Sequence, residues 1–292
     1  MSKTVRVVDG VTTPKPDRRT LRRIYKDVPL FLSLSATTMI VLVALLAPVI
    51  SPYDPLHLDI ASALRPPSPG AWFGTDEAGR DVLSRTIWGA RLSLVSAAGV
   101  LVIASSLGSA VGIVSGYRGG AVDQVLMRLT DLFFAFPGLL LAIAITTALG
   151  PSPENAILSI ALVWWPVYAR LVRSRTLSVK ENLYIEAARA LGLSEARILF
   201  KHILPQSWGI IVARLTVDIG HAILLTASLG FLGLGNRAPS PEWGSMIAAS
   251  RPYFLSYWWT ATFPGLAMLI TVVVFSLAGD TLYESLGVSK AS

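Results

Sequence analysis

Long apolar runs separated by shorter polar segments dominate the chain. Several runs approach the ~20 residues that cross a bilayer as a helix. They cover residues 28–50, 92–114, 126–149, 156–169, 209–234 and 258–282. The pattern predicts an all-α membrane protein with six transmembrane helices. An N-terminal signal peptide is the alternative for the first run, but this run exceeds the 7 to 15 apolar residues of a typical signal. We therefore expect an uncleaved span.

Small residues and prolines inside these runs predict how the helices pack. Gly108, Gly112 and Gly116 recur every fourth residue, which makes a ridge on which another helix packs closely. Pro137-Gly138 predicts a kink in the third span, and Pro166 interrupts the short fourth one.

The distribution of positive charge predicts the orientation. The formal net charge is +7, and nineteen of the 25 Lys and Arg residues fall on the side that holds the N-terminal tail and the even loops. Cytoplasmic loops hold such an excess, so both termini are predicted to be cytoplasmic. The bias explains the basic character without nucleic-acid binding, for which no motif is present.

These expectations divide the chain into segments. We predict a cytoplasmic tail, a first transmembrane helix, an external loop, a five-helix transmembrane core that contains a cytoplasmic loop at residues 178–205, and a C-terminal tail. The segments cover residues 1–27, 28–50, 51–91, 92–286 and 287–292, respectively.

Motifs for catalysis and cofactor binding are missing from the sequence. There is no G-x-x-x-x-G-K-[ST] phosphate loop and no G-x-S-x-G elbow. The chain has no cysteine, and its three histidines lie outside any metal-ligand spacing. We expect a non-catalytic chain with no metal or cofactor of its own.

Residues 178–205 are the most informative polar segment. The sequence predicts a helix from Glu181 to Leu191 that Gly192 ends in a left-handed conformation. Ser194 is expected to cap a second helix, which Pro205 ends. The exposed side chains would be Tyr184, Ile185, Ala188, Leu191 and Leu193. Composition leaves two interpretations open: an amphipathic element on the membrane, or a docking element for a soluble partner.

One motif in this loop carries a family resemblance. Glu186-Ala187-Ala188, then Gly192, then His202-Ile203-Leu204-Pro205 resembles the E-A-A…G…I-x-L-P signature of permease subunits of bacterial ABC importers. Position 202 usually holds an aliphatic residue. The resemblance implies the type I ABC importer permease fold in the bacterial cytoplasmic (inner) membrane.

Two further stretches narrow the resemblance to the C-type subunit of dipeptide/oligopeptide/nickel permeases. They are residues 73–94, which begin Phe-Gly-Thr-Asp-Glu-Ala-Gly-Arg-Asp, and residues 231–244 with Phe-Leu-Gly-Leu-Gly. The chain departs from that branch at Thr226, where an acidic residue is frequent, and in the sequence after Asp280.

The resemblance implies partners and sites. The partners would be a homologous second permease, two ATP-binding subunits that hold ATP and Mg²⁺, and an extracytoplasmic substrate-binding protein. The ATPase subunits would dock on Tyr184, Glu186, Ala187, Ala188, Arg189, Leu191, Gly192 and Leu193. Contacts with the binding protein are expected at Asp76, Arg80 and Asp81.

Ionisable residues inside the fifth span are candidates for the translocation pathway. Arg214, Asp218 and His221 share one helical face, and charges at such depth normally face a cavity or a partner. A local Arg214–Asp218 pair competes with direct substrate contact. The rival function is a proton-coupled secondary transporter or channel that uses Asp218 and His221. The tryptophans at 164, 165, 258 and 259 are expected at the membrane interfaces.

Overall fold

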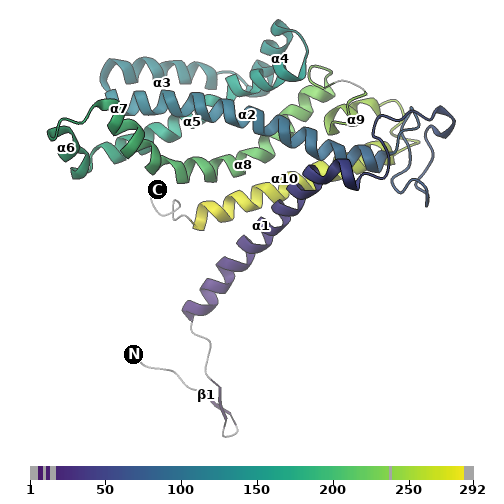
Figure 1. Ribbon diagram of the computed structural model, residues 1–292, viewed down its shortest axis with the longest axis horizontal. Coiled ribbons are helices and arrows are strands. Elements are labelled where there is room, and N and C mark those ends of the chain that lie inside the picture. The colour runs from purple at the N-terminus through teal and green to yellow at the C-terminus, as the bar shows by residue number, and fades with distance from the viewer. Residues whose placement is uncertain (1–5, 9–10, 14–17, 237–238, 286–292) are drawn as a thin grey trace.

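Helices make up most of the described chain in the computed structural model, which describes residues 6–8, 11–13, 18–236 and 239–285 (Figure 1). The α-helices are α1 Arg18–Ile50, α2 Val82–Arg118, α3 Gly120–Phe134, α4 Gly138–Leu149, α5 Pro153–Lys180, α6 Leu183–Ala190, α7 Glu195–Ile198, α8 Leu204–Phe231, α9 Trp243–Ala249 and α10 Trp259–Ser285. A 3₁₀ turn covers Ile60–Ser62, and a π-helical segment covers Leu199–Ile203.

Five stretches of the described residues are long and apolar enough to cross a membrane. They are Pro29–Ile50, Val82–Arg118, Pro153–Lys180, Glu195–Phe231 and Trp259–Tyr283. Helices α3 and α4 pass the same test only as a pair, with a bend of 92° between them. The break lies at the predicted Pro137-Gly138, but it is a sharp corner and not a kink within one helix. Neither helix alone is long enough to span ~30 Å of hydrocarbon at 1.5 Å per residue.

The glycine ridge of α2 shows that the bent pair counts as one broken span. A Cβ on Gly112 would lie 2.5 Å from the Ala169 carbonyl, and one on Gly116 would lie 2.8 Å from Thr176 Cβ. Residue numbers thus rise together along α2 and α5, so these helices run parallel. The chain must cross back between them, and α3 and α4 are the elements that carry it. With the bent pair counted as one span, the described residues hold the six spans that the sequence predicts; without it they hold five.

Small residues set the core of the bundle. Helix α2 buries alanines, serines and its glycines against α5 and α8, with Val100, Ile160 and Ile223 fully enclosed. The predicted close approach on the glycine ridge is therefore confirmed. Helix α1 packs less deeply, against α10 and α2, and its Ser33 hydroxyl lies 3.1 Å from the Thr281 hydroxyl of α10. Most of its large apolar side chains remain exposed, as a lipid-facing helix requires.

Several predicted helices were too short. Helix α5 continues through the buried Pro166 to Lys180, so the fourth span is longer than residues 156–169. Proline removes only one donor, and in a membrane neighbouring helices tolerate that break. Ser152 begins α5 by accepting a hydrogen bond from the Asn155 amide at 3.1 Å.

The N-terminal region also differs from the predicted tail. Helix α1 begins at Arg18, and Arg6–Val8 pairs with Val11–Thr13 as a two-stranded antiparallel sheet. Residues 1–5, 9–10 and 14–17 of the tail lie outside the described residues, as does the predicted C-terminal tail at 287–292.

Two structures cap opposite ends of the bundle. Figure 1 shows α6 and α7 at one end, and α9 together with the loop between α1 and α2 at the other. The candidate site residues are thus divided between two ends and the middle of α8.

Candidate functional site

A helix–turn–helix element projects from the end of the bundle where α5 stops. Helix α6 ends in a left-handed turn at Gly192, whose φ is +76°, as the sequence predicted. The Gly192 amide donates to the Arg189 carbonyl at 2.9 Å, and the Leu193 amide donates to the Ala188 carbonyl at 3.1 Å. This pair of bonds is a Schellman motif, which satisfies the free carbonyls of the helix end.

One face of α6 is buried, contrary to the prediction that Ile185 and Ala188 are exposed. Both pack with Val179, Ile198 and Ile203 in a small apolar cluster under the turn. The spacing of three residues places Ile185 and Ala188 on the same helical face, and the flanking spans supply the apolar partners.

The opposite face of α6 is open. Leu183 is 81% exposed and Leu191 79% exposed, and Tyr184 is also exposed. Glu186, Ala187, Arg189 and Gly192 are exposed, whereas Leu193 is partly buried. Such large apolar side chains at a helical tip mark a surface that another molecule can cover. We call Leu183, Tyr184, Ala187 and Leu191 the α6 surface.

The second helix of this element is not the one the sequence predicted. Helix α7 stops at Ile198, where a π-helical segment leads directly into α8. Ser194 makes no capping side-chain bond, and Pro205 lies in the first turn of α8 instead of ending a helix. Proline suits that position because the first amides of a helix have no intrahelical partner.

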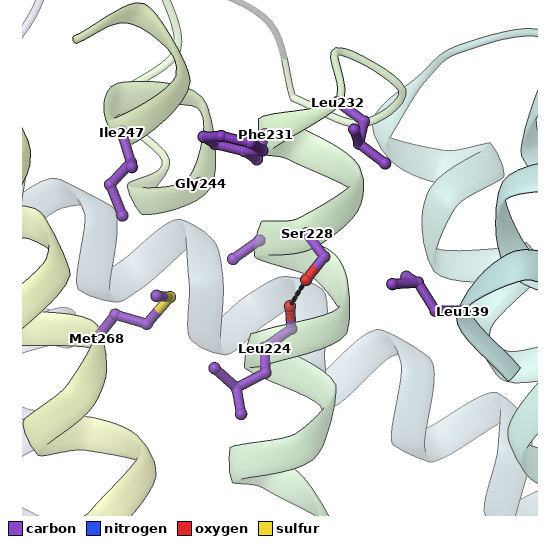
Figure 2. Close-up of a pocket in the computed structure, with 9 residues that line it drawn as sticks. Leu139, Leu224, Ser228, Phe231, Leu232, Gly244, Ile247 and Met268 are labelled. Carbon is purple, nitrogen blue, oxygen red and sulfur yellow. Dashed lines mark hydrogen bonds between the residues drawn. The ribbon is translucent and has the colours of Figure 1, made fainter. Parts of the chain in front are cut away.

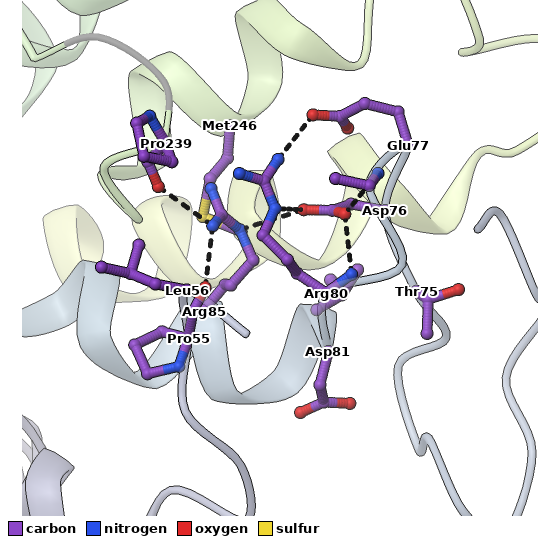
Figure 3. Close-up of polar contacts among 12 residues, drawn as sticks. Pro55, Leu56, Thr75, Asp76, Glu77, Arg80, Asp81, Arg85, Pro239 and Met246 are labelled. Atoms are coloured by element: carbon purple, nitrogen blue, oxygen red, sulfur yellow. Dashed lines mark hydrogen bonds and ion pairs between the residues drawn. The ribbon is translucent and has the colours of Figure 1, made fainter. Parts of the chain in front are cut away.

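The opposite end is built on buried ion pairs (Figure 3). Arg80 Nε lies 2.7 Å from Asp76 Oδ2 and its Nη2 lies 2.6 Å from Glu77 Oε1. Arg85 Nε lies 3.2 Å from the same Asp76 oxygen. Arg85 Nη1 also donates to the carbonyls of Pro55, at 2.9 Å, and Pro239, at 3.1 Å. This cluster joins the loop before α2, the start of α2 and the segment before α9.

Burial changes the interpretation of the predicted binding-protein contacts. Asp76, Arg80 and Asp81 are buried, so their charged groups are directed inward and offer little surface to a partner. Asp81 begins α2 by accepting hydrogen bonds from the amide and hydroxyl of Ser84, at 2.7 and 2.6 Å. The three residues hold the loop between α1 and α2 in shape.

Glu242 is a buried acidic residue that sequence reasoning missed. It begins α9 by accepting hydrogen bonds from the amides of Gly244 and Ser245, each at 2.9 Å. Burial raises the pKa of its carboxyl above the usual range, and these two amides oppose the rise. A glutamate directly before Trp-Gly-Ser was the only available signal.

The predicted Arg214–Asp218 pair is confirmed in the middle of α8. Arg214 Nε lies 3.0 Å from Asp218 Oδ2. Two residues of α5 donate to the same oxygen, Tyr168 through its hydroxyl at 2.9 Å and Trp164 through Nε1 at 3.2 Å. Trp164 is thus a partner of the pair and not an interface anchor. His221 is exposed beside it, 6.1 Å from the Trp164 ring.

Two of the other three expected tryptophan anchors are also internal. Trp165 is buried, and Trp259 is buried with its indole nitrogen donating to the Thr75 carbonyl at 3.1 Å. Trp258 is half exposed, as an anchor should be.

An apolar cavity of about 360 Å³ lies beside α8, between α4, α9 and α10 (Figure 2). Its lining is Leu139, Leu224, Ala227, Ser228, Phe231, Leu232, Gly244, Ile247 and Met268. The Ser228 hydroxyl donates to the Leu224 carbonyl at 2.7 Å, so the lining offers no free polar group there.

Comparison with known proteins identifies the family. Residues 108–287 match the family described as binding-protein-dependent transport system inner membrane component. The chain belongs to this family and is a multi-pass membrane protein.

Relatives cover most of the chain. It is 40% identical to the dipeptide transport system permease protein DppC of Alkalihalophilus pseudofirmus, over 95% of this chain and 91% of that protein. It is 42% identical to the probable D,D-dipeptide transport system permease protein DdpC of Escherichia coli, over 87% of each. It is 39% identical to the glutathione transport system permease protein GsiD of Pectobacterium atrosepticum, over 85% of this chain and 83% of that protein.

A solved structure shows the same fold. A chain of the inward-facing MetNI methionine ABC transporter superposes with a TM-score of 0.57 at 19% identity, covering 70% of this chain and 97% of that one. The predicted permease fold is confirmed by this match. None of the comparisons supports the proton-coupled alternative.

Proposed function

We propose that this chain is one permease subunit of an ATP-driven importer of dipeptides or other short peptides. Three relatives of about 40% identity carry dipeptide or glutathione transport in their names, and each aligns over more than four fifths of the chain. Dipeptides and glutathione share a small peptide skeleton with charged termini. The proposed substrate class rests on that common chemistry.

The partners follow from the family. A homologous second permease would complete the translocation path, and an extracytoplasmic binding protein would deliver the peptide. Two ATP-binding subunits would bind ATP with Mg²⁺, since the sequence contains no phosphate loop. The membrane would be the bacterial cytoplasmic membrane, with both termini inside.

The observation that carries the proposal is the α6 surface. Its apolar side chains are exposed, while its inner face is fixed on a buried cluster between the ends of α5 and α8. A displacement of α6 would therefore move two spans directly. Only two residues separate the end of α5 from the start of α6, and the π-helical segment joins α7 to α8. This surface is the proposed docking site of an ATP-binding subunit.

Two substitutions test this docking site. Ala187→Trp adds bulk to the exposed face, and Gly192→Val forces a β-branched residue into a positive φ, although its Cβ would meet no atom within 4 Å. We expect both variants to insert normally but to lose ATP-binding subunits and peptide import by at least tenfold. Import into proteoliposomes and subunit retention on an affinity column measure the two effects.

Matched controls separate docking from general damage. Gly209→Val makes the same replacement at an exposed glycine whose φ is not positive, again with no atom within 4 Å. Ala61→Trp adds the same bulk at the opposite end of the bundle. Both controls should retain the ATP-binding subunits. Full retention and import by Ala187→Trp and Gly192→Val would exclude the α6 surface as the docking site.

A further inference from the structure

The Arg214 guanidinium is held by one nitrogen and leaves two others open. Nε is bound to Asp218, and among the residues whose side chains the structure describes, 29–236 and 239–283, no hydrogen bond reaches Nη1 or Nη2. The side chain is 35% exposed, whereas Asp218 is completely buried. Asp218, Tyr168 and Trp164 therefore position the guanidinium, and only Arg214 can reach a ligand.

The pairing turns Arg214 away from the nearer end of its helix. Arg214 lies ten residues into α8, about 15 Å along its axis. A lysine or arginine at such a position normally extends toward the near interface. Here the guanidinium instead reaches Asp218, one turn further into the span. The open nitrogens are thus held near mid-span and not at the membrane surface.

The face of α8 that carries Arg214 and His221 is too polar to contact the hydrocarbon of a bilayer. An exposed guanidinium and the exposed His221 lie about two turns apart on it, beside Trp164. Ionisable groups at this depth face a water-filled cavity or another protein chain. The mid-span face of α8 that holds Arg214 and His221 therefore borders the path or the second permease.

We propose that Arg214 binds the carboxylate of the peptide during its passage. A guanidinium presents paired N–H groups that match the two oxygens of a carboxylate. Every unmodified peptide carries such a group at its C-terminus, whatever its side chains. The inference rests on the proposed function, and it assigns the recognised chemical group and the residue that recognises it.

Cysteine chemistry tests this assignment, because the chain has no cysteine of its own. The double variant Arg214→Cys/Asp218→Asn removes the cation without leaving an unpaired buried carboxylate. Val273→Cys serves as a control of similar depth, since Val273 is 46% exposed near the middle of α10 and is flanked by Val272 and Val274 in the sequence. The assembled importer, with its other subunits made cysteine-free, is treated with charged methanethiosulfonates.

Three results are expected. The aminoethyl reagent modifies position 214 at least tenfold faster than position 273. The parent imports the dipeptide faster than the same dipeptide with a C-terminal amide, and the unmodified double variant loses this preference. The unmodified double variant imports dipeptide at least tenfold more slowly than the parent, and the aminoethyl adduct restores import whereas the sulfonatoethyl adduct does not.

Other outcomes overturn the assignment. Equal reaction at positions 214 and 273 would place Arg214 away from water. An unchanged preference for the acid over the amide in the double variant would mean that Arg214 does not recognise the carboxylate. Slower reaction at position 214 than at position 273 would mean that the second permease covers this position. By contrast, a parent importer that takes up no peptide at all would contradict the proposed function.

Discussion

The two ends of the helix bundle are held together by different interactions. At the α9 end, charged side chains are buried and paired with one another, as in the Asp76, Arg80 and Arg85 cluster. At the α6 end, the contacts buried directly under α6 are apolar, and the charged residues of α6 itself face outward. The buried charged groups of the α9 end are thus paired within this chain, while α6 leaves the large apolar side chains of Leu183 and Leu191 exposed.

The two kinds of contact differ in how rigidly they hold the chain and in how much apolar surface they leave for a partner. A buried ion pair with its hydrogen bonds complete fixes one geometry, because breaking it leaves an uncompensated charge. An apolar cluster tolerates small shifts more easily, and its exposed face gains free energy when a partner covers it. The α9 end is therefore a fixed frame, and the α6 end is the surface that needs another molecule.

The largest expected effect is on the ion-pair cluster. Arg85→Gln should reduce the free energy of unfolding by about 3 to 5 kcal/mol, because Asp76 loses one of its two cations in a buried site and two carbonyls lose their donor. Thermal unfolding in detergent measures the loss. The control Arg91→Gln alters an exposed arginine that lies over the Trp88 ring. Equal destabilisation by both variants would show that the cluster has no special role.

A somewhat smaller and more local effect is expected at the other end. Ile185→Ala removes a buried side chain under the turn and should cost about 2 to 4 kcal/mol of local stability. Hydrogen exchange of residues 183–198 should accelerate, while α2 and α5 remain protected. The control Leu191→Ala changes an exposed side chain and should leave exchange unaltered. Acceleration throughout the bundle would mean that the α6 end is not a separate unit.

Sequence reasoning succeeded where the determining interactions are local. Hydropathy found the spans, the left-handed turn at Gly192 follows from its lack of a Cβ, and the four-residue spacing of Arg214 and Asp218 fixed their pairing. These features depend on residues within a few turns of each other. The motif in residues 186–205 is equally local, and it was sufficient to indicate the family.

Sequence reasoning failed where the burial of a residue depends on segments far away in the chain. Contacts with a binding protein were expected at Asp76 and Arg80, but these two residues pair with each other in a buried site. Arg85 of α2 also pairs with Asp76 and donates to the Pro239 carbonyl in the segment before α9. Ile185 was expected to be exposed, but it packs against apolar residues that lie on both sides of α6 along the chain, in α5 and the π-helical segment. Only the folded chain brings these groups together.

Single cysteines are expected to change stability least. Their labelling decides whether the α9 end and the α6 end lie on opposite sides of the membrane. Ser68 lies in the loop near α9, and Ser178 lies near the end of α5, at the α6 end (Figure 1). Both are exposed, so each serine-to-cysteine change should alter stability by no more than about 0.5 kcal/mol. An impermeant thiol reagent added to intact cells should label cysteine at position 68 or 240 and leave position 178 unlabelled. The excess of Lys and Arg beside residue 178 predicts that side to be cytoplasmic.

The same experiment tests the broken span, because α2, the bent pair and α5 make three crossings between positions 68 and 178. Labelling of both positions would mean that α3 and α4 do not carry the chain across the membrane. Labelling of position 178 alone would reverse the orientation and place the α6 surface outside, where no ATP-binding subunit could reach it.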